Sequence, residues 1–272
     1  MKIGNREFDI KNGAYIMGIL NVTPDSFSDG GKFYSVDNAL FHVEKMIEAG
    51  VDIIDVGGES TRPGHIQISD QEEIDRVLPV IEKIKNNFDI PVSLDSYKSD
   101  VINALKTNID LVNDIWGLKY DPKMASLISE TGLPCCLMHN RKKLDYTDFW
   151  NDFISDMKET IDIAKKNGIS DDKIILDAGV GFQKEYEHNL IAVNRTDELC
   201  KLGYPVLIAT SKKRFIGAST GKETENRTAG TLATTVIGLM KGATFFRVHD
   251  VDENVDAIKV TKSVLEERQW IR

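Results

Sequence analysis

The chain has 272 residues, of which 41% are hydrophobic and 28% are charged. This balance is typical of a globular protein and excludes a wholly disordered chain or a collagen-like repeat. The formal net charge of −9 disfavours binding to nucleic acid or to an anionic membrane. No apolar run approaches the roughly 18 residues of a membrane span, and residues 1–13 lack the apolar core of a signal peptide. We therefore expect a cytoplasmic protein with neither nucleic acid nor membrane as a partner.

The three cysteines point to the same compartment. Cys135 and Cys136 are adjacent within an apolar run, and Cys200 stands alone. The odd count and the spacing match neither a disulfide framework nor a zinc site. We expect all three to behave as small apolar residues.

Short β-branched runs alternate with amphipathic segments of helical period along the chain. Before them, a Gly4-Asn5 turn predicts a small hairpin between residues 2–3 and 7–10, expected to cap the bottom of the fold. In chain order the expected elements are strand 15–20, a helix ending at Gly50, strand 52–56, helix 72–88, strand 91–94, helix 100–106, strand 111–113, helix 122–131, strand 134–138, helix 149–167, strand 173–176, helix 197–202, strand 205–209, helix 228–241, strand 244–248 and helix 252–267.

This alternation predicts an α/β fold, a (β/α)8 TIM barrel with a short N-terminal hairpin. The strand runs carry few alternating polar residues, as in parallel sheets covered on both faces. Eight right-handed βα units can close a barrel, and about 250 residues suffice for one. No linker or low-complexity tract divides the chain, so residues 1–272 are expected to form one domain. An open doubly wound sheet is the alternative that the element count leaves open.

Polar or ionisable residues follow every one of the eight apolar runs. Each has a structural alternative, such as a helix cap for Asp95 or Asp177, a rim ion pair for Arg247 or a surface position for His249. In a barrel, however, the C-terminal ends of the strands converge on one mouth, where the active sites of such enzymes lie. In chain order these ends are Asn21, 57–65, Asp95, Asn113 with Asp114, Met138 with His139, Asp177, 211–214 and 247–250.

By chemistry, the expected mouth divides into two halves. Asp95, Asn113, Asp177 and Lys213 suit a flat amino-pyrimidinone ring, because carboxylates accept from ring N–H groups and a lysine donates to the carbonyl. Met138 and Phe182 can sandwich such a ring. The other half is rich in donors without carboxylates between them, as phosphoryl oxygens require. Its members are Asn21, Thr61, Arg62, Arg247 and His249.

Two long strings identify a family. Residues 17–31 read MGILNVTPDSFSDGG and residues 55–64 read DVGGESTRPG. With RVHD at 247–250, they make the chain similar to the dihydropteroate synthases, folate-pathway enzymes inhibited by sulfonamides, over essentially its whole length. The resemblance implies condensation of 6-hydroxymethyl-7,8-dihydropterin diphosphate with 4-aminobenzoate, giving 7,8-dihydropteroate and pyrophosphate. It also implies a Mg²⁺ requirement and a homodimer formed through outer helices.

The resemblance also implies roles for individual residues. Asn21 would contact Mg²⁺ as well as the diphosphate. As a separate hypothesis about the mechanism, we expect Asp29 to face the positive charge that develops on the pterin. The implied catalytic residues are Arg62, Lys213, Arg247, His249 and Asp29. The implied pterin contacts are Asp95, Asn113, Ile115, Met138, Asp177, Phe182 and Lys213; the diphosphate contacts are Asn21, Arg62, Arg247 and His249; and the aminobenzoate pocket comprises Phe27, Ser28, Thr61 and Pro63.

The sequence departs from the family pattern at several positions. Ala178 stands where the family commonly has proline, Lys212 where it commonly has arginine, and Trp116 where a small residue is common. The loop after His139 also lacks the usual continuation. The arginine change is mild if the side chain makes only a rim contact, but a bidentate role would be lost.

Two other functions stay open. Methyltetrahydrofolate:corrinoid methyltransferases have a similar barrel and pterin slot but need neither a diphosphate site nor magnesium. A pterin-binding paralogue without activity is the second alternative. The Thr61-Arg62 and Arg247-x-His249 pairs favour the synthase over the methyltransferase, because they suit a diphosphate.

Overall fold

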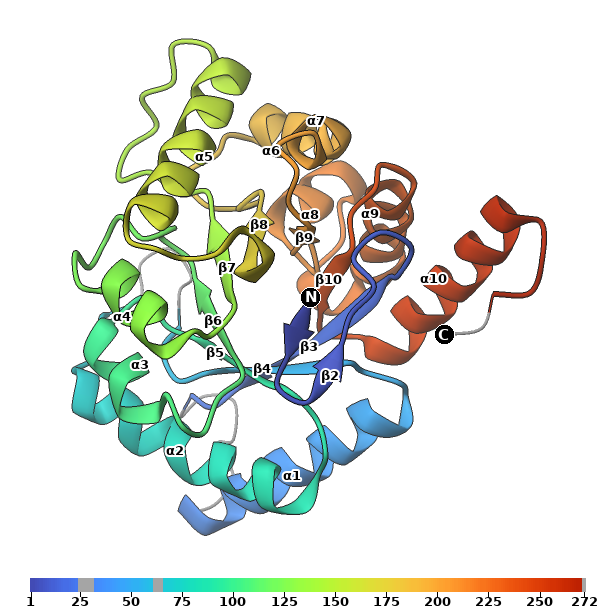
Figure 1. Ribbon diagram of the computed structural model, residues 1–272. Coiled ribbons are helices and arrows are strands. Elements are labelled where there is room, and N and C mark those ends of the chain that lie inside the picture. Colours follow the sequence, from blue (N-terminus) through green and yellow to red (C-terminus); the bar gives the residue numbers. More distant parts are fainter. Residues whose placement is uncertain (24–31, 61–65, 271–272) are drawn as a thin grey trace.

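The computed structural model describes residues 1–23, 32–60 and 66–270. Within them, eight parallel strands close into a barrel in the order β10-β3-β4-β5-β6-β7-β8-β9, and helices surround it (Figure 1). The predicted TIM barrel is therefore confirmed, and the open-sheet alternative is wrong. The barrel strands are β3 (Tyr15–Asn21), β4 (Ile53–Gly57), β5 (Val92–Asp95), β6 (Leu111–Asp114), β7 (Cys135–Met138), β8 (Ile174–Asp177), β9 (Val206–Ile208) and β10 (Phe245–Val248).

The outer helices follow the expected alternation with two exceptions. Helix α6 was missed because its apolar residues 190–193 are consecutive in sequence and give no helical stripe. Helix α8 was missed because it is short and contains Gly217 with Ser and Thr, which are weak helix formers. The helices are α1 (Lys32–Glu48), α2 (Asp70–Asn87), α3 (Ser99–Leu105), α4 (Met124–Thr131), α5 (Phe149–Lys166), α6 (Tyr186–Asn194), α7 (Thr196–Cys200), α8 (Arg214–Thr220), α9 (Thr228–Met240) and α10 (Val251–Glu266).

A two-stranded hairpin of β1 (Lys2–Ile3) and β2 (Arg6–Glu7) closes the end of the barrel where the strands begin. Ile3 and Phe8 are buried in one cluster with Met17, Ile53 and Phe245, at or near the starts of their strands. Figure 1 shows this dark blue hairpin crossing that end of the barrel. The expected bottom cap is confirmed, although its second strand is shorter than residues 7–10. The opposite end, formed by the C-terminal ends of the strands, is the mouth.

Strand periodicity places an apolar layer below a polar layer inside the barrel. Successive strand residues point to opposite faces, so positions two apart share the interior. In β4, Ile54 and Val56 pack outward with the helices, whereas Ile53 belongs to the interior cluster. Asp55 is therefore the next interior position, closer to the mouth. The same step of two links Ser93 with Asp95, Leu111 with Asn113, Ile175 with Asp177 and Phe245 with Arg247.

Candidate active site

Arg247 lies between two carboxylates at the mouth. Its Nε donates to Asp55 Oδ2 at 2.6 Å, and its Nη2 donates to Asp95 Oδ2 at 2.6 Å. Asn113 Nδ2 also donates to Asp55 Oδ2, at 3.2 Å. The expectation that the donor half of the site contains no carboxylates is therefore wrong for Arg247. Inward-facing residues of β4, β5 and β10 meet across the barrel, so Arg247 joins the two halves rather than belonging to one.

Burial strongly perturbs the charged groups around Arg247. It raises the pKa of Asp95 to about 7, and Asp55 adds to this rise while Arg247 opposes it. Burial alone would lower the pKa of Arg247, but the carboxylates of Asp55 and Asp95 raise it above its usual value. Arg247 therefore stays charged and holds together two acids that would otherwise repel each other.

Three buried oxygen atoms beside this ion pair have no hydrogen-bond partner among the described residues. They are Asp55 Oδ1, Asp95 Oδ1 and Asn113 Oδ1. Leaving a buried acceptor unpaired costs about 1–3 kcal/mol. A bound ligand that presents N–H donors would recover this energy. The interior therefore favours a ring with several donors on one edge.

Asp177 and Lys213 border the same group of side chains. Asp177 Oδ1 accepts a 2.8 Å hydrogen bond from the backbone N–H of Gly179, and burial raises the pKa of this carboxyl. Lys213 Nζ lies 4.4 Å from the centroid of the Phe182 ring. Burial and the nearby Arg247 lower the pKa of Lys213 to about 8, against the attraction of Asp177 and Asp95. We refer to Asp55, Asp95, Asn113, Asp177, Lys213 and Arg247 as the mouth cluster.

An apolar wall stands beside the mouth cluster. Tyr97, Ile115 and Met138 form a small buried cluster, with Phe182 and the half-buried Trp116 packed against it. Trp116 also stacks obliquely on Tyr120, with ring centroids 5.7 Å apart. The structure thus brings together all seven predicted pterin contacts at the mouth. The large Trp116 side chain lies at the edge of their apolar part.

The C-terminal end of β10 carries two further polar contacts. His249 Nδ1 lies 2.9 Å from Ser211 Oγ, and burial together with Arg247 lowers the pKa of His249 to about 4. Lys212 Nζ donates to Asp250 Oδ1 at 2.7 Å, a partly exposed ion pair. Lys212 thus makes a rim contact, which favours the expectation that replacing the family's arginine by lysine is a mild change.

Asn21 ends β3 beside the mouth cluster. A Cβ placed on Gly57 would be 3.8 Å from both Asn21 Oδ1 and Asp95 Oδ2, so Asn21 lies on the side of the mouth where Asp95 accepts from Arg247. Within the described residues, no three His, Cys, Asp or Glu side chains form a metal site. The amide oxygen of Asn21 would suit Mg²⁺, which commonly takes one or two protein oxygens and completes its shell with water and substrate phosphates.

Six predicted site residues lie outside the described residues. Phe27, Ser28 and Asp29 belong to 24–31, and Thr61, Arg62 and Pro63 belong to 61–65. The described part of the site therefore contains the seven expected pterin-contact residues, together with Asn21, Arg247 and His249.

Sequence reasoning missed two charged residues at the mouth. Asp55 lies within the apolar run 52–56, and its place two positions after Ile53, on the same face of the strand, is the signal that identifies it. Lys184 carries no such signal, because it follows the β8 end by seven residues. Its ammonium nevertheless reaches back to the turn that follows Asp177.

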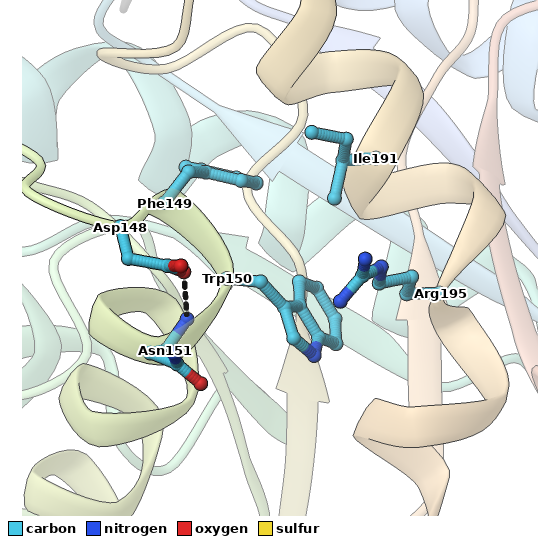
Figure 2. Close-up of a pocket in the computed structure, with 6 residues that line it drawn as sticks. All are labelled: Asp148, Phe149, Trp150, Asn151, Ile191 and Arg195. Atoms are coloured by element: carbon cyan, nitrogen blue, oxygen red, sulfur yellow. Dashed lines mark hydrogen bonds between the residues drawn. The ribbon is translucent and has the colours of Figure 1, made fainter.

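A surface cleft of about 290 Å³ lies apart from these residues, between the start of α5 and helix α6 (Figure 2). Its charged groups already have structural partners. Asp148 caps α5 by accepting from the Asn151 N–H at 3.0 Å, and Arg195 lies over the Trp150 ring. No residue of the mouth cluster lines this cleft, and its side chains support local packing rather than catalysis.

Comparisons with known proteins agree with this geometry. Residues 17–249 match the family model described as pterin binding enzyme. The chain is 54% identical to a dihydropteroate synthase of Clostridium beijerinckii over 267 residues, covering 97% of this chain and 99% of the relative.

Solved structures show the same similarity. The barrel resembles the Clostridium difficile dihydropteroate synthase crystallised with pteroic acid, with a TM-score of 0.92, 46% identity and coverage of 95% of this chain and 99% of that one. It also resembles the Xanthomonas albilineans enzyme with 4-aminobenzoic acid, with a TM-score of 0.90, 37% identity and coverage of 93% and 94% of the two chains.

Proposed function

The chain belongs to the dihydropteroate synthase family of pterin-binding enzymes, and from this membership we propose how its barrel mouth performs the reaction. The reaction joins 6-hydroxymethyl-7,8-dihydropterin diphosphate to 4-aminobenzoate and yields 7,8-dihydropteroate and pyrophosphate. Pteroic acid and 4-aminobenzoic acid in the related crystals identify the class of small molecules concerned.

The unpaired buried oxygens carry the proposed pterin orientation. The amino-pyrimidinone edge of the pterin presents N–H donors to the unpaired oxygens of Asp95 and Asn113, and also to the carboxylate of Asp177. Lys213 donates to the ring carbonyl, while Phe182 and Met138 cover the faces of the ring. Asp55 acts through Arg247 and Asn113, which it holds in place.

The leaving diphosphate is proposed to lie toward Arg247 and His249. Two N–H groups of Arg247 hold carboxylates, which leaves its other guanidinium donors for phosphate oxygens. His249 is neutral near pH 7; with the Ser211 hydroxyl donating to Nδ1, its ring hydrogen sits on Nε2 and can be donated to an oxyanion. These donors stabilise charge that grows as the carbon–oxygen bond breaks.

Charge balance supports a Mg²⁺ requirement. The two cations of the mouth cluster, Lys213 and Arg247, already interact with its acidic side chains, so little of their positive charge is left to balance a diphosphate. Arg62 and a Mg²⁺ ion near Asn21 are the proposed sources of further positive charge. When bound, the ion would neutralise charge on the diphosphate oxygens.

Bond breaking ahead of attack explains why the site needs no strong base. The electron-rich dihydropterin delocalises positive charge on its methylene carbon as pyrophosphate departs. The neutral amine of 4-aminobenzoate then forms the carbon–nitrogen bond and loses a proton to the departing pyrophosphate or to water. We propose that Asp29 faces this cation and that Phe27, Ser28, Thr61 and Pro63 surround the aminobenzoate.

Pyrophosphate release tests the reaction and the metal together. We expect release only when the pterin diphosphate, 4-aminobenzoate and Mg²⁺ are all present, and loss of activity in EDTA that excess Mg²⁺ reverses. Binding of pteroic acid, which has no diphosphate, should be unchanged by EDTA. Release that is unaffected by EDTA would contradict the Mg²⁺ proposal. No release under any condition would favour the inactive paralogue, and methyl transfer to a corrinoid would favour the methyltransferase.

A homodimer through the outer helices is also proposed. Helices α9 and α10 pack side by side and expose large apolar side chains, including Met240, Val260 and Val264, which are 64%, 64% and 70% exposed. Val260 and Val264 are four residues apart and so share one face of α10, and exposed apolar side chains on one face mark an interaction surface. The occupant that fits the family resemblance is a second copy of the chain.

Light scattering coupled to size-exclusion chromatography tests the dimer. The protein should elute at twice the chain mass of 30.5 kDa. Val264→Asp places a charge within the apolar face and should shift the mass toward the monomer, whereas Leu144→Asp, at an exposed position between β7 and α5, should not. A monomeric wild-type protein, or equal behaviour of the two variants, would exclude this interface.

A cytoplasmic location is proposed from the cysteines. Within the described residues Cys135, Cys136 and Cys200 are free thiols, and the first two are buried. None of the helices described is both long and apolar enough to cross a membrane.

A further inference from the structure

Lys184 is a charged residue enclosed beside the pterin side of the mouth, with no part in the reaction as proposed above. Its Nζ lies 2.9 Å from His139 Nδ1, 2.9 Å from Gly179 O and 3.1 Å from Phe182 O, with His139 O at 3.3 Å. An ammonium has three hydrogens to donate, and the three nearest acceptors account for them. Lys184 therefore makes its strong contacts with protein groups and none is left for a substrate.

Two of these acceptors belong to the turn that carries pterin contacts. The turn begins at Asp177, whose carboxylate accepts from the Gly179 N–H at 2.8 Å, and it continues to Phe182, whose N–H donates to Gly179 O at 3.1 Å. Lys184 donates to the carbonyl oxygens of both Gly179 and Phe182. A single cation thus draws both ends of the turn together.

The close approach of the turn to β7 requires glycine at its centre. Gly179 has φ of +62°, and a Cβ there would lie 2.0 Å from the carbonyl oxygen of His139. Only a residue without a side chain permits this approach. The gap between the Gly179 turn and the end of β7 is therefore narrow, and the Lys184 ammonium bridges it.

His139 extends the same network to helix α5. Its Nε2 lies 3.0 Å from Asp156 Oδ2, and Arg141 Nε donates to that same oxygen at 2.6 Å. If Lys184 donates to Nδ1, the neutral His139 ring must carry its hydrogen on Nε2 and donate it to Asp156. Lys184, His139 and Asp156 then form a chain from the turn to the outer helix layer.

We infer that Lys184 is a positioning residue for pterin binding, because it holds the turn that carries Asp177 and Phe182 in the arrangement that receives the ring. His139 and Asp156 hold the Lys184 ammonium in place. This inference rests on the proposed pterin contacts. Without the ammonium, the turn samples other arrangements. The apparent affinity for the pterin then falls in proportion to the fraction of molecules whose turn is competent to bind.

Calorimetric titration with pteroic acid, the compound in the related Clostridium difficile crystal, tests the inference. The work is done at pH 6.5, below the value of about 7 to which burial lowers the pKa of Lys184, so that the ammonium predominates. Lys184→Met keeps the apolar stem and removes the donors. We expect about tenfold weaker binding, as when a tenth of the molecules hold the competent turn. The matched control Lys158→Met, on the exposed face of α5, should bind as the wild type does.

Steady-state kinetics separate positioning from general damage. In Lys184→Met the KM for the pterin diphosphate should rise about tenfold, whereas kcat and the KM for 4-aminobenzoate at saturating pterin should stay near their wild-type values. A partly unfolded variant would instead lose kcat with both KM values unchanged, and that result would overturn the inference. Wild-type affinity for pteroic acid in Lys184→Met would overturn it as well.

The ¹⁵N NMR spectrum of wild-type His139, assigned with His139→Gln, provides a test that needs no Lys184 variant to fold. The inference requires a neutral ring with its hydrogen on Nε2. A hydrogen on Nδ1 would exclude donation from Lys184 and overturn the inference. If the wild-type protein itself fails to bind pteroic acid, the proposed pterin contacts fail, which is distinguishable from equal binding by wild type and Lys184→Met.

Discussion

Arg247→Ala is expected to reduce kcat by about a hundredfold or more, the scale of losing a preorganised donor to a developing charge. The guanidinium faces the proposed leaving group and also lies between Asp55 and Asp95, donating to each carboxylate at 2.6 Å. Its removal would leave two buried carboxylates facing the departing pyrophosphate. The measurement is pyrophosphate release under saturating substrates, with the exposed Arg268→Ala as the control.

The same substitution should also lower the free energy of unfolding. Removing one partner of a buried ion pair typically costs about 3–5 kcal/mol, because the remaining charge loses its compensation. Adding Asp55→Asn to Arg247→Ala removes one of the two stranded charges. The double variant should regain stability in urea unfolding without regaining turnover. If activity returned along with stability, or if Arg247→Ala kept wild-type kcat, the role at the leaving group would be excluded.

Asp177→Ala is expected to weaken pterin binding by about ten- to a hundredfold. A hydrogen bond to a charged group contributes about 1.5–3 kcal/mol, and each 1.4 kcal/mol corresponds to a factor of ten in affinity. This carboxylate also accepts the Gly179 N–H, so its loss loosens the turn that presents Phe182. Titration with pteroic acid measures the effect.

A comparison of variants separates the two contributions of Asp177. Asp177→Asn keeps an oxygen for the Gly179 N–H but replaces the second acceptor by an NH₂ donor, which opposes the ring donors of the pterin. It should therefore bind nearly as weakly as Asp177→Ala. Asp172→Ala, on an exposed 3₁₀ turn before β8, is the control and should bind normally. Unchanged affinity in Asp177→Ala would remove this residue from the pterin site.

The local pattern of the sequence was enough to predict the barrel. Each strand run is short and apolar, and each is followed by polar residues, because interior positions near the mouth lie two residues beyond the apolar layer. The same pattern placed Asp95, Asn113 and Asp177 at the mouth ends of their strands, where the structure has them in β5, β6 and β8. Their ligand contacts stay predictions. Helices α6 and α8 were missed because consecutive apolar residues, or a short segment with glycine, carry no helical period.

By itself, therefore, the sequence determined the alternation of strands and helices, the family and the strand ends at which chemistry takes place, whereas the structure excluded the open sheet. Only the tertiary structure decided which charges face each other: Arg247 and Asp55 are 192 residues apart, and Lys184 meets His139 across 45 residues. Periodicity reports which face of an element a side chain occupies, but not its neighbour across a closed barrel. Such pairs form because burial makes an isolated charge costly, and that cost exists only once the chain has folded around it.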